Sequence, residues 1–218
     1  MKKKLFIFDM DGLLINTEEI YQNCWIKTFE SEKLIVSEEE CRKLVGMGIK
    51  LSEDYFEKLF GNRNEYWRLR AMRETFFWQY IDEHGITIKD GVMNVLNWCK
   101  DQGHQTAIAT STHRQRSLKL LEIAGLDFAF DYQGYGDEVK NTKPDPEILI
   151  NIINQANIEK GEAIIFEDSA NGLVAAYRAG IDVVWVKDVA EIELNPQMLP
   201  FAKLNQIDEI IDIFKRIA

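Results

Sequence analysis

The most informative residues of this chain are two aspartates close to its start. An apolar run at 5–8 stops at Asp9, and Asp11 follows two positions later. A short apolar run without alternation predicts a buried strand of a parallel sheet, and such sheets bind ligands at the carboxyl ends of their strands. Burying two carboxylates together is costly, so the pair predicts a site that holds a cation and leaves one carboxylate free for chemistry. The alternative is a strand that ends in a helix N-cap, with Asp11-Gly12 as a turn.

Three further polar clusters stand at the ends of other predicted elements. Thr110-Ser111-Thr112 follows the apolar run 107–109, Glu167-Asp168-Ser169 follows the run 164–166, and Lys143 precedes a predicted helix. The carboxyl ends of parallel strands share one edge of a sheet, so we expect these clusters to meet there. That edge would hold four carboxylates, two hydroxyls and one ammonium group, from Asp9, Asp11, Glu167, Asp168, Thr110, Ser111 and Lys143.

Each cluster also has a simpler interpretation. The hydroxyl run and the Glu-Asp-Ser run could each cap the helix that follows, and Lys143 could be a solvated loop lysine. These readings do not explain why four clusters fall at one predicted edge. A metal–phosphate site does, because Mg²⁺ prefers a few carboxylates plus substrate phosphate, and hydroxyls and a lysine can hold the remaining phosphate oxygens.

The elements that would position these residues alternate between strand and helix. This alternation predicts an α/β fold, a Rossmann-like parallel sheet with helices on both faces. We expect strands at 4–9, 106–110, 130–133, 163–166 and 183–186, and helices at 91–102, 113–124, 146–156, 170–179 and 207–217.

The sequence pattern of residues 18–85 predicts helices and no strands, with a capping box at Ser37-Glu38-Glu39-Glu40. The first strand needs partners and must join the later strands, so the helical block is an insertion. We therefore expect a core domain of residues 1–15 and 88–218 and a helical cap domain of residues 16–87. Thr17 is expected to cap the helix that starts at Glu18.

Composition narrows the class of protein and of partner. Among 218 residues, 36 acidic side chains against 26 basic ones leave a net charge of −10, which disfavours nucleic acid or an anionic membrane as a partner. The spacing of the three cysteines fits no zinc site, and we expect them to be reduced thiols. No apolar run approaches the length of a transmembrane helix. We expect a cytoplasmic protein, a monomer, with a small-molecule partner.

Four motifs in this chain resemble those of the haloacid dehalogenase superfamily, in the family's order. The stretches at 9–14, 109–111, 143–147 and 166–172 read DMDGLL, ATS, KPDPE and FEDSANG. The resemblance spans nearly the whole chain, and the helical insert resembles the family's small C1-type cap. The subgroup that it resembles is that of β-phosphoglucomutases and related sugar-phosphate phosphatases.

This resemblance implies a mechanism and a role for each residue. Asp9 would attack phosphorus and form an aspartyl-phosphate, and Asp11 would act as general acid and then as base. Mg²⁺ would bind the Asp9 carboxylate, the Asp11 carbonyl and Asp168, with Glu167 as a ligand or just behind one. Thr110 and Lys143 would stabilise charge on the phosphoryl group. Phosphate contacts are further expected from Gly12 and Ser111.

The cap loop is expected to separate a phosphatase from a mutase. In the mutases we expect an arginine where this chain has Ile49, and often a histidine where it has Tyr21. Both departures favour a phosphatase that acts on a small phosphorylated metabolite, with Gly46 and Lys50 as candidate substrate contacts. β-Phosphoglucomutase remains the alternative, and a non-catalytic phosphate sensor on the same fold is a remote one, disfavoured because both Asp9 and Asp11 are present.

Overall fold

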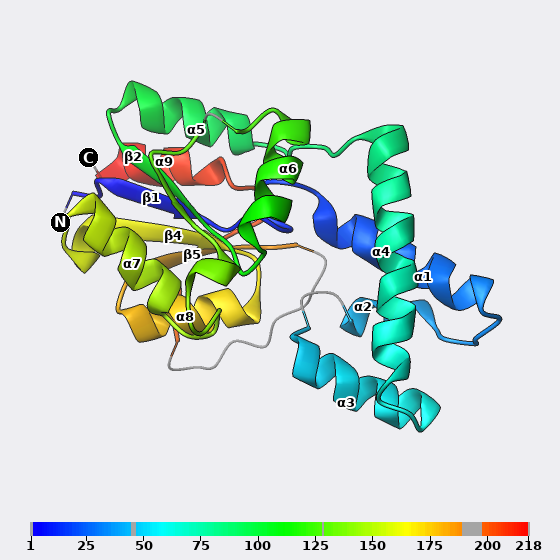
Figure 1. Cartoon of the computed structure of the whole chain (residues 1–218). Coiled ribbons are helices and arrows are strands. Elements are labelled where there is room, and N and C mark those ends of the chain that lie inside the picture. The colour runs from blue at the N-terminus through cyan, green and yellow to red at the C-terminus, as the bar shows by residue number, and fades with distance from the viewer. Residues whose placement is uncertain (1, 45–46, 128, 189–197, 218) are drawn as a thin grey trace. The chain divides into compact units, whose positions relative to one another are not determined.

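A computed structural model of the chain describes residues 2–44, 47–127, 129–188 and 198–217. The chain divides into two compact units. One unit comprises Met1–Asn16 and Thr87–Ala218, and the other comprises Thr17–Ile86. The second unit is therefore inserted into the first, a few residues after the first strand (Figure 1).

The first unit is built on a parallel sheet. In the described part of the chain the sheet has six strands in the order β3-β2-β1-β4-β5-β6, and every pair is parallel. The bounds are β1 (Leu5–Phe8), β2 (Gln105–Ala109), β3 (Tyr132–Gly134), β4 (Ala163–Glu167), β5 (Asp182–Val186) and β6 (Ala202–Leu204). Because β1 lies between β2 and β4, the residues that follow these three strands emerge side by side at the carboxyl edge.

The predicted Rossmann-like α/β class is confirmed, with two differences in the strands. β6 was not predicted, because Ala and Lys are uncommon in strands and three residues carry no pattern. β3 begins two residues later than predicted, at Tyr132. The reason lies in Asp131, whose carboxylate accepts the Thr106 backbone N–H at 2.8 Å and so takes the place of a ladder carbonyl.

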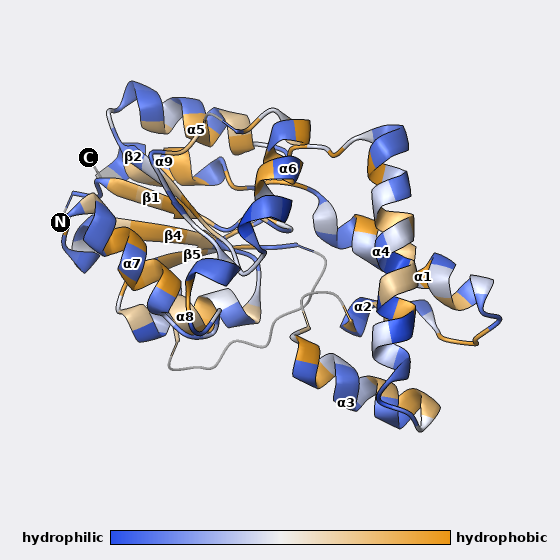
Figure 2. Ribbon diagram, in the orientation of Figure 1, coloured by the Kyte–Doolittle hydropathy of each residue, from blue (hydrophilic) through white to orange (hydrophobic). Residues whose placement is uncertain are grey.

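Helices cover both faces of the sheet. α5 (Val92–Asp101) and α9 (Glu209–Ile217) lie on one face, and α7 (Glu147–Ala156) and α8 (Ala170–Ala179) lie on the other (Figure 1). The other helical elements in the described part of this unit are α6 (Arg114–Ala124), η1 (Gly136–Glu138) and η2 (Lys160–Glu162). This arrangement explains why the strands carry apolar side chains at successive positions, as the orange strands of Figure 2 show.

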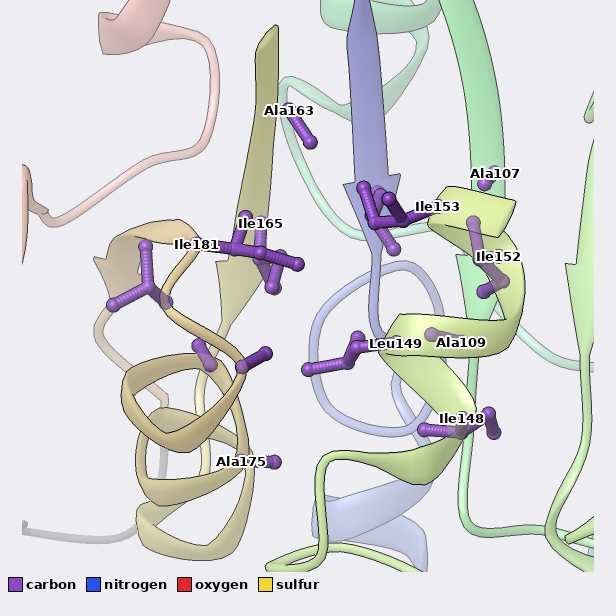
Figure 3. Close-up of a cluster of buried hydrophobic side chains, with 14 of the residues drawn as sticks. Ala107, Ala109, Ile148, Leu149, Ile152, Ile153, Ala163, Ile165, Ala175 and Ile181 are labelled. Carbon is purple, nitrogen blue, oxygen red and sulfur yellow. The ribbon is translucent and has the colours of Figure 1, made fainter. Parts of the chain in front are cut away.

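The two faces of β1 belong to different cores. Leu5 and Ile7 pack with the aliphatic side chains of α7 and α8 in a cluster rich in Ala, Ile and Leu (Figure 3). Phe6 belongs to an aromatic core, with ring centroids 5.5 Å from Trp98 and 5.4 Å from Phe214. All four side chains of β1 are fully buried, so the strand that leads to Asp9 is held firmly from both sides.

The inserted unit is helical, as predicted. It contains α1 (Thr17–Ser31), α2 (Glu38–Lys43), α3 (Ile49–Phe60) and α4 (Glu65–His84). Its core is largely aromatic and includes Trp25, Phe29 and Phe56. The predicted capping box of Ser37 and Glu40 is confirmed. The prediction that Thr17 caps α1 is wrong, because α1 begins at Thr17 itself, whose side chain is buried.

The two chain segments next to the insertion are bonded to each other. The Asn16 N–H donates to the Thr87 carbonyl at 3.0 Å, and the Lys89 N–H donates to the Leu14 carbonyl at 2.9 Å. Ile15 and Ile88 form an antiparallel bridge between these bonds. Among the described residues, no helix combines the length and the apolar character that crossing a membrane requires.

Candidate active site

Asp9 and Lys143 form the centre of the polar cluster at the carboxyl edge of the sheet. Asp9 follows β1, and its backbone N–H donates to the Phe166 carbonyl of β4 at 3.1 Å. The Lys143 ammonium donates to Asp9 Oδ1 at 2.6 Å and to the Ala109 carbonyl at 2.7 Å. It also forms a hydrogen bond and ion pair with Glu167. The alternative in which Lys143 is a solvated loop lysine is wrong, because its side chain is only 4% exposed.

Glu167 is the most deeply buried carboxylate of the cluster. Its side chain has no solvent exposure, and its second oxygen, Oε2, accepts the Ser169 hydroxyl at 3.0 Å. Gly172 on α8 makes room for it, because a Cβ on Gly172 would lie 1.9 Å from the carboxylate carbon. The Ser169 hydroxyl also accepts the Gly172 N–H at 3.0 Å and so caps α8. The capping interpretation therefore holds for Ser169 alone, and Glu167 faces Lys143.

Asp11 lies against the hydroxyl run that follows β2. Its Oδ2 accepts the Thr112 hydroxyl at 2.7 Å and lies 3.4 Å from the Thr110 hydroxyl. The interpretation of this run as a helix cap is wrong, because the N-cap of α6 is His113 and no side chain caps it. Asp11 is not a helix cap either, since α1 begins only at Thr17. Thr112 was missed as a site residue, although it is the third hydroxyl of the predicted run.

Three buried carboxylates of the cluster have the arrangement of a cation site. Asp9, Glu167 and Asp168 each offer an oxygen, and these oxygens all lie within 4.8 Å of one another. Burial raises the pKa of Asp9 to about 8 against the opposing effect of Lys143, and the neighbouring Glu167 and Asp11 add to the rise. For Lys143, burial opposes the charged form, yet the attraction of Asp9 and Glu167 prevails and raises its pKa.

This chemistry fits a hard divalent cation. An all-oxygen set of carboxylates is what Mg²⁺ selects, and its charge would lower the pKa of Asp9 and keep the carboxylate ionised at neutral pH. Asp9 and Asp168 are the residues best placed to hold the ion. Both oxygens of Glu167 already accept hydrogen bonds, from Lys143 and Ser169, which favours a supporting role for Glu167 behind the ligands.

The other predicted site residues have different surroundings. Gly12 lies in the turn after Asp11, where its N–H donates to the Ile15 carbonyl at 3.0 Å. Ser111 is exposed beside the site. Lys50 is exposed near the start of α3 in the helical unit, and Gly46 lies outside the described residues. The predicted contacts of these four residues with substrate stay predictions.

Comparison with known proteins identifies the family. The family model for haloacid dehalogenase-like hydrolases matches residues 6–186, so the chain belongs to that family. The match includes all four motifs and confirms the resemblance found in the sequence. The chain is an enzyme of the family's phosphatase type.

Individual relatives are similar over most of their length. A phosphorylated carbohydrates phosphatase of Thermotoga maritima is 31% identical over 183 residues, which is 82% of each chain. A validoxylamine A 7'-phosphate phosphatase of Streptomyces hygroscopicus subsp. limoneus is 26% identical, over 87% of this chain and 88% of that one. Among solved structures, a protein of Thermotoga maritima described as "putative beta-phosphoglucomutase" is 27% identical, with a TM-score of 0.78 and both chains covered fully.

Proposed function

We propose that this protein is a Mg²⁺-dependent phosphatase that hydrolyses a small phosphorylated metabolite through an aspartyl-phosphate on Asp9. The observation that carries the proposal is the position of Asp9 at the end of β1. There the Lys143 ammonium is 2.6 Å from Asp9 Oδ1, and the carboxylates of Glu167 and Asp168 lie beside it. A nucleophile next to an ammonium group and a cation site is the arrangement that phosphoryl transfer requires.

Each residue of the site has a separate task in this mechanism. Asp9 Oδ attacks phosphorus while the bond from phosphorus to the ester oxygen breaks and its electron pair stays on that oxygen. Asp11 gives its proton to the departing oxygen, and as a carboxylate it then takes a proton from the water that attacks the phosphoryl group. Thr110, Ser111 and Lys143 hold the phosphoryl oxygens and offset their negative charge.

The metal ion would be held by the Asp9 carboxylate, the Asp11 carbonyl and Asp168, with Glu167 supporting Lys143. When bound, Mg²⁺ supplies positive charge that reduces the repulsion between Asp9 and the phosphate. The buried carboxylate oxygens and the raised pKa of Asp9 support this assignment.

The substrate class follows from the relatives. Two proteins that this chain resembles over more than four fifths of its length are named for phosphatase activity on phosphorylated carbohydrates and on a validoxylamine phosphate. We therefore favour a sugar phosphate or a similar phosphorylated polyol. A small neutral substrate body with one phosphate also suits an acidic protein, since Lys143 and the metal supply the local positive charge.

A mutase is the second candidate, favoured by the similarity to the Thermotoga maritima structure. A β-phosphoglucomutase would need a residue that binds a second phosphate. The position at which we expect an arginine is Ile49, a partly exposed apolar residue at the first position of α3. This departure is the reason for preferring hydrolysis.

The test is phosphate release from a panel of sugar, polyol and nucleoside monophosphates, with Mg²⁺ or with excess EDTA. We expect release from one or a few sugar or polyol phosphates, only with Mg²⁺, and none from Asp9→Asn. If glucose 1-phosphate were converted to glucose 6-phosphate in the presence of a bisphosphate with little free phosphate, the mutase would replace the phosphatase. Undiminished release in EDTA would contradict the metal requirement.

A further inference from the structure

We propose that Thr112 is a positioning residue that fixes the Asp11 carboxylate for proton transfer to the leaving group. This inference rests on the proposed function, because it assigns a helper to the general acid of that mechanism. Thr112 belongs to the hydroxyl run 110–112, but only Thr110 and Ser111 of that run were expected to contact phosphate.

The contact between Thr112 and Asp11 is short and involves only one of the two carboxylate oxygens. The Thr112 hydroxyl donates to Asp11 Oδ2 at 2.7 Å, the ordinary length for a hydroxyl-to-carboxylate bond. The Thr110 hydroxyl lies 3.4 Å from the same oxygen, too far for a strong bond. Asp11 Oδ1 is buried and has no hydrogen-bond partner in the described part of the chain. Holding Oδ2 therefore fixes the rotamer and leaves Oδ1 as the atom that can carry the transferable proton.

The backbone around Thr112 is itself fixed. The Thr112 N–H donates to the Thr110 hydroxyl at 3.1 Å, and the Thr112 carbonyl accepts the Gly136 N–H at 3.0 Å. Gly136 allows this close approach, because a Cβ there would lie 2.0 Å from the Ser111 carbonyl oxygen. The hydroxyl thus projects from a segment that is bonded on both sides of its Cα.

A second set of contacts holds Arg114, two residues after Thr112. The Arg114 N–H donates to Asp137 at 2.7 Å, which replaces the missing side-chain cap of α6. The Arg114 guanidinium pairs with Glu138 at 2.7 Å and lies over the ring of Tyr135. Segment 135–138 therefore holds both the end of the hydroxyl run, through Thr112, and the start of α6, through Arg114. A hydroxyl on such a rigid support can hold a carboxylate in one orientation, as general acid catalysis requires.

The consequence is a dependence on the leaving group. In the first step the Asp9 oxygen bonds to phosphorus, the ester bond breaks, and the Asp11 proton passes to the ester oxygen. An alkyl leaving group needs that proton, whereas 4-nitrophenolate leaves without it. Loss of the Thr112 hydroxyl should thus slow the first step for an alkyl phosphate and spare it for 4-nitrophenyl phosphate.

The experiment compares Thr112→Val and Thr112→Ser in the full-length protein with Mg²⁺. The readout is the pre-steady-state burst of released alcohol or nitrophenol, which reports enzyme phosphorylation alone. For the best alkyl phosphate of the panel, we expect Thr112→Val to slow the burst by about 10-fold or more, a part of the range for general acid catalysis. KM should change little, the nitrophenyl burst should stay within about 3-fold, and Thr112→Ser should recover most of the rate.

Two controls separate positioning from folding. Thr106→Val removes a buried hydroxyl of β2 that donates to the Ala129 carbonyl and makes no contact with Asp11. This variant should leave the alkyl-to-aryl ratio unchanged. In an Asp11→Asn background, Thr112→Val should have no further effect on the alkyl burst, because the two residues act as one unit. An additional loss in that background, equal losses for both esters, or no loss at all would overturn the inference. Absence of any Mg²⁺-dependent hydrolysis by the unaltered protein would instead contradict the proposed function.

Discussion

At the scale of single residues, the site depends on a buried lysine that two carboxylates share. Lys143 donates to Asp9, to Glu167 and to a backbone carbonyl, so all three of its ammonium protons have acceptors. The cost of removing this charge from water is offset only by these contacts. Lys143 thus stabilises the carboxyl edge of the sheet, and in the proposed mechanism it also holds the phosphoryl group.

Replacing Lys143 by methionine should therefore damage both properties. With one partner removed, Asp9 and Glu167 remain buried without compensation, which typically costs about 3–5 kcal/mol. We expect urea unfolding in EDTA to show a loss of this size, and Mg²⁺ to recover part of it by occupying the space between the carboxylates. Unchanged stability in EDTA would contradict the buried ion pairs as described.

At this scale, most of the candidate site residues could be predicted from the sequence, but the contacts between them could not. The motifs at Asp9, Thr110, Lys143 and Asp168 were recognisable, because strand ends of a parallel sheet share an edge and the spacing of each motif is visible. The pairing of Lys143 with Asp9 and Glu167 could not be recognised from the sequence, because it depends on how the segment between β3 and β4 folds. The contact between Thr112 and Asp11 could not be predicted for the same reason, because the two residues are far apart in the chain.

At the scale of elements, a second lysine secures the opposite edge of the sheet. The buried Lys3 ammonium donates to the carbonyls of Gly161 and Ala163 at 2.9 and 2.7 Å and to Asp182 at 2.6 Å. It joins the segment before β1 to the starts of β4 and β5. This contact could not be read from the sequence, in which Lys3 is one of three consecutive lysines.

Lys3→Met should lower the free energy of unfolding without altering catalysis. Leaving buried carbonyls without their donor costs about 1–3 kcal/mol. Lys4→Met is the matched control, because the Lys4 side chain is 57% exposed where it pairs with Glu162. This ion pair should be worth less than about 1 kcal/mol. Equal unfolding midpoints in urea for the two variants, or a lower kcat in Lys3→Met at a temperature at which it is folded, would argue against this assignment.

Element boundaries were predicted less well than element types. The strands β1, β2 and β4 lie where apolar runs predicted them, because burial on both faces leaves a continuous signal. β6 carries no such signal, and the side chain of Asp131 displaces the start of β3. In both cases the decisive interaction comes from a neighbouring strand and not from the segment itself.

At the scale of the whole molecule, one histidine couples stability to pH. The His104 ring packs against Phe6 and Trp98 in the aromatic core, and burial, with Lys2 nearby, lowers its pKa below the ordinary 6.5. The unfolded chain then binds a proton more readily than the folded one. Stability supplied by neutral His104 is present above about pH 6.5 and is lost as the pH falls toward the lowered pKa.

His104→Gln should flatten this dependence. We expect the fall in unfolding free energy between about pH 7.5 and about pH 5.5 to be smaller in this variant than in the unaltered protein. His84→Gln, at an exposed position on α4, is the control and should leave the fall unchanged. Urea titrations at the two pH values decide the matter, and parallel pH profiles for all three proteins would refute the role of His104.

The division into two units leads to a prediction about specificity. We propose that the helical unit acts as a lid that selects the substrate, with Lys50, near the start of α3, as one contact. Lys50→Ala should alter the ranking of sugar phosphates by kcat/KM and spare 4-nitrophenyl phosphate. Lys58→Ala, at an exposed position of the same helix, should change neither. A uniform loss for every substrate in Lys50→Ala would remove Lys50 from substrate selection.

The central claim is that Asp9 becomes covalently phosphorylated during turnover. Rapid acid quenching of the enzyme with Mg²⁺ and its best substrate, followed by mass spectrometry of the peptide that contains residues 5–15, tests this claim directly. We predict one added phosphoryl group on Asp9 within a turnover, more of it in Asp11→Asn, and none in Asp9→Asn. Full catalytic turnover with no phosphoryl group on this peptide, or with the group on another residue, would contradict the account.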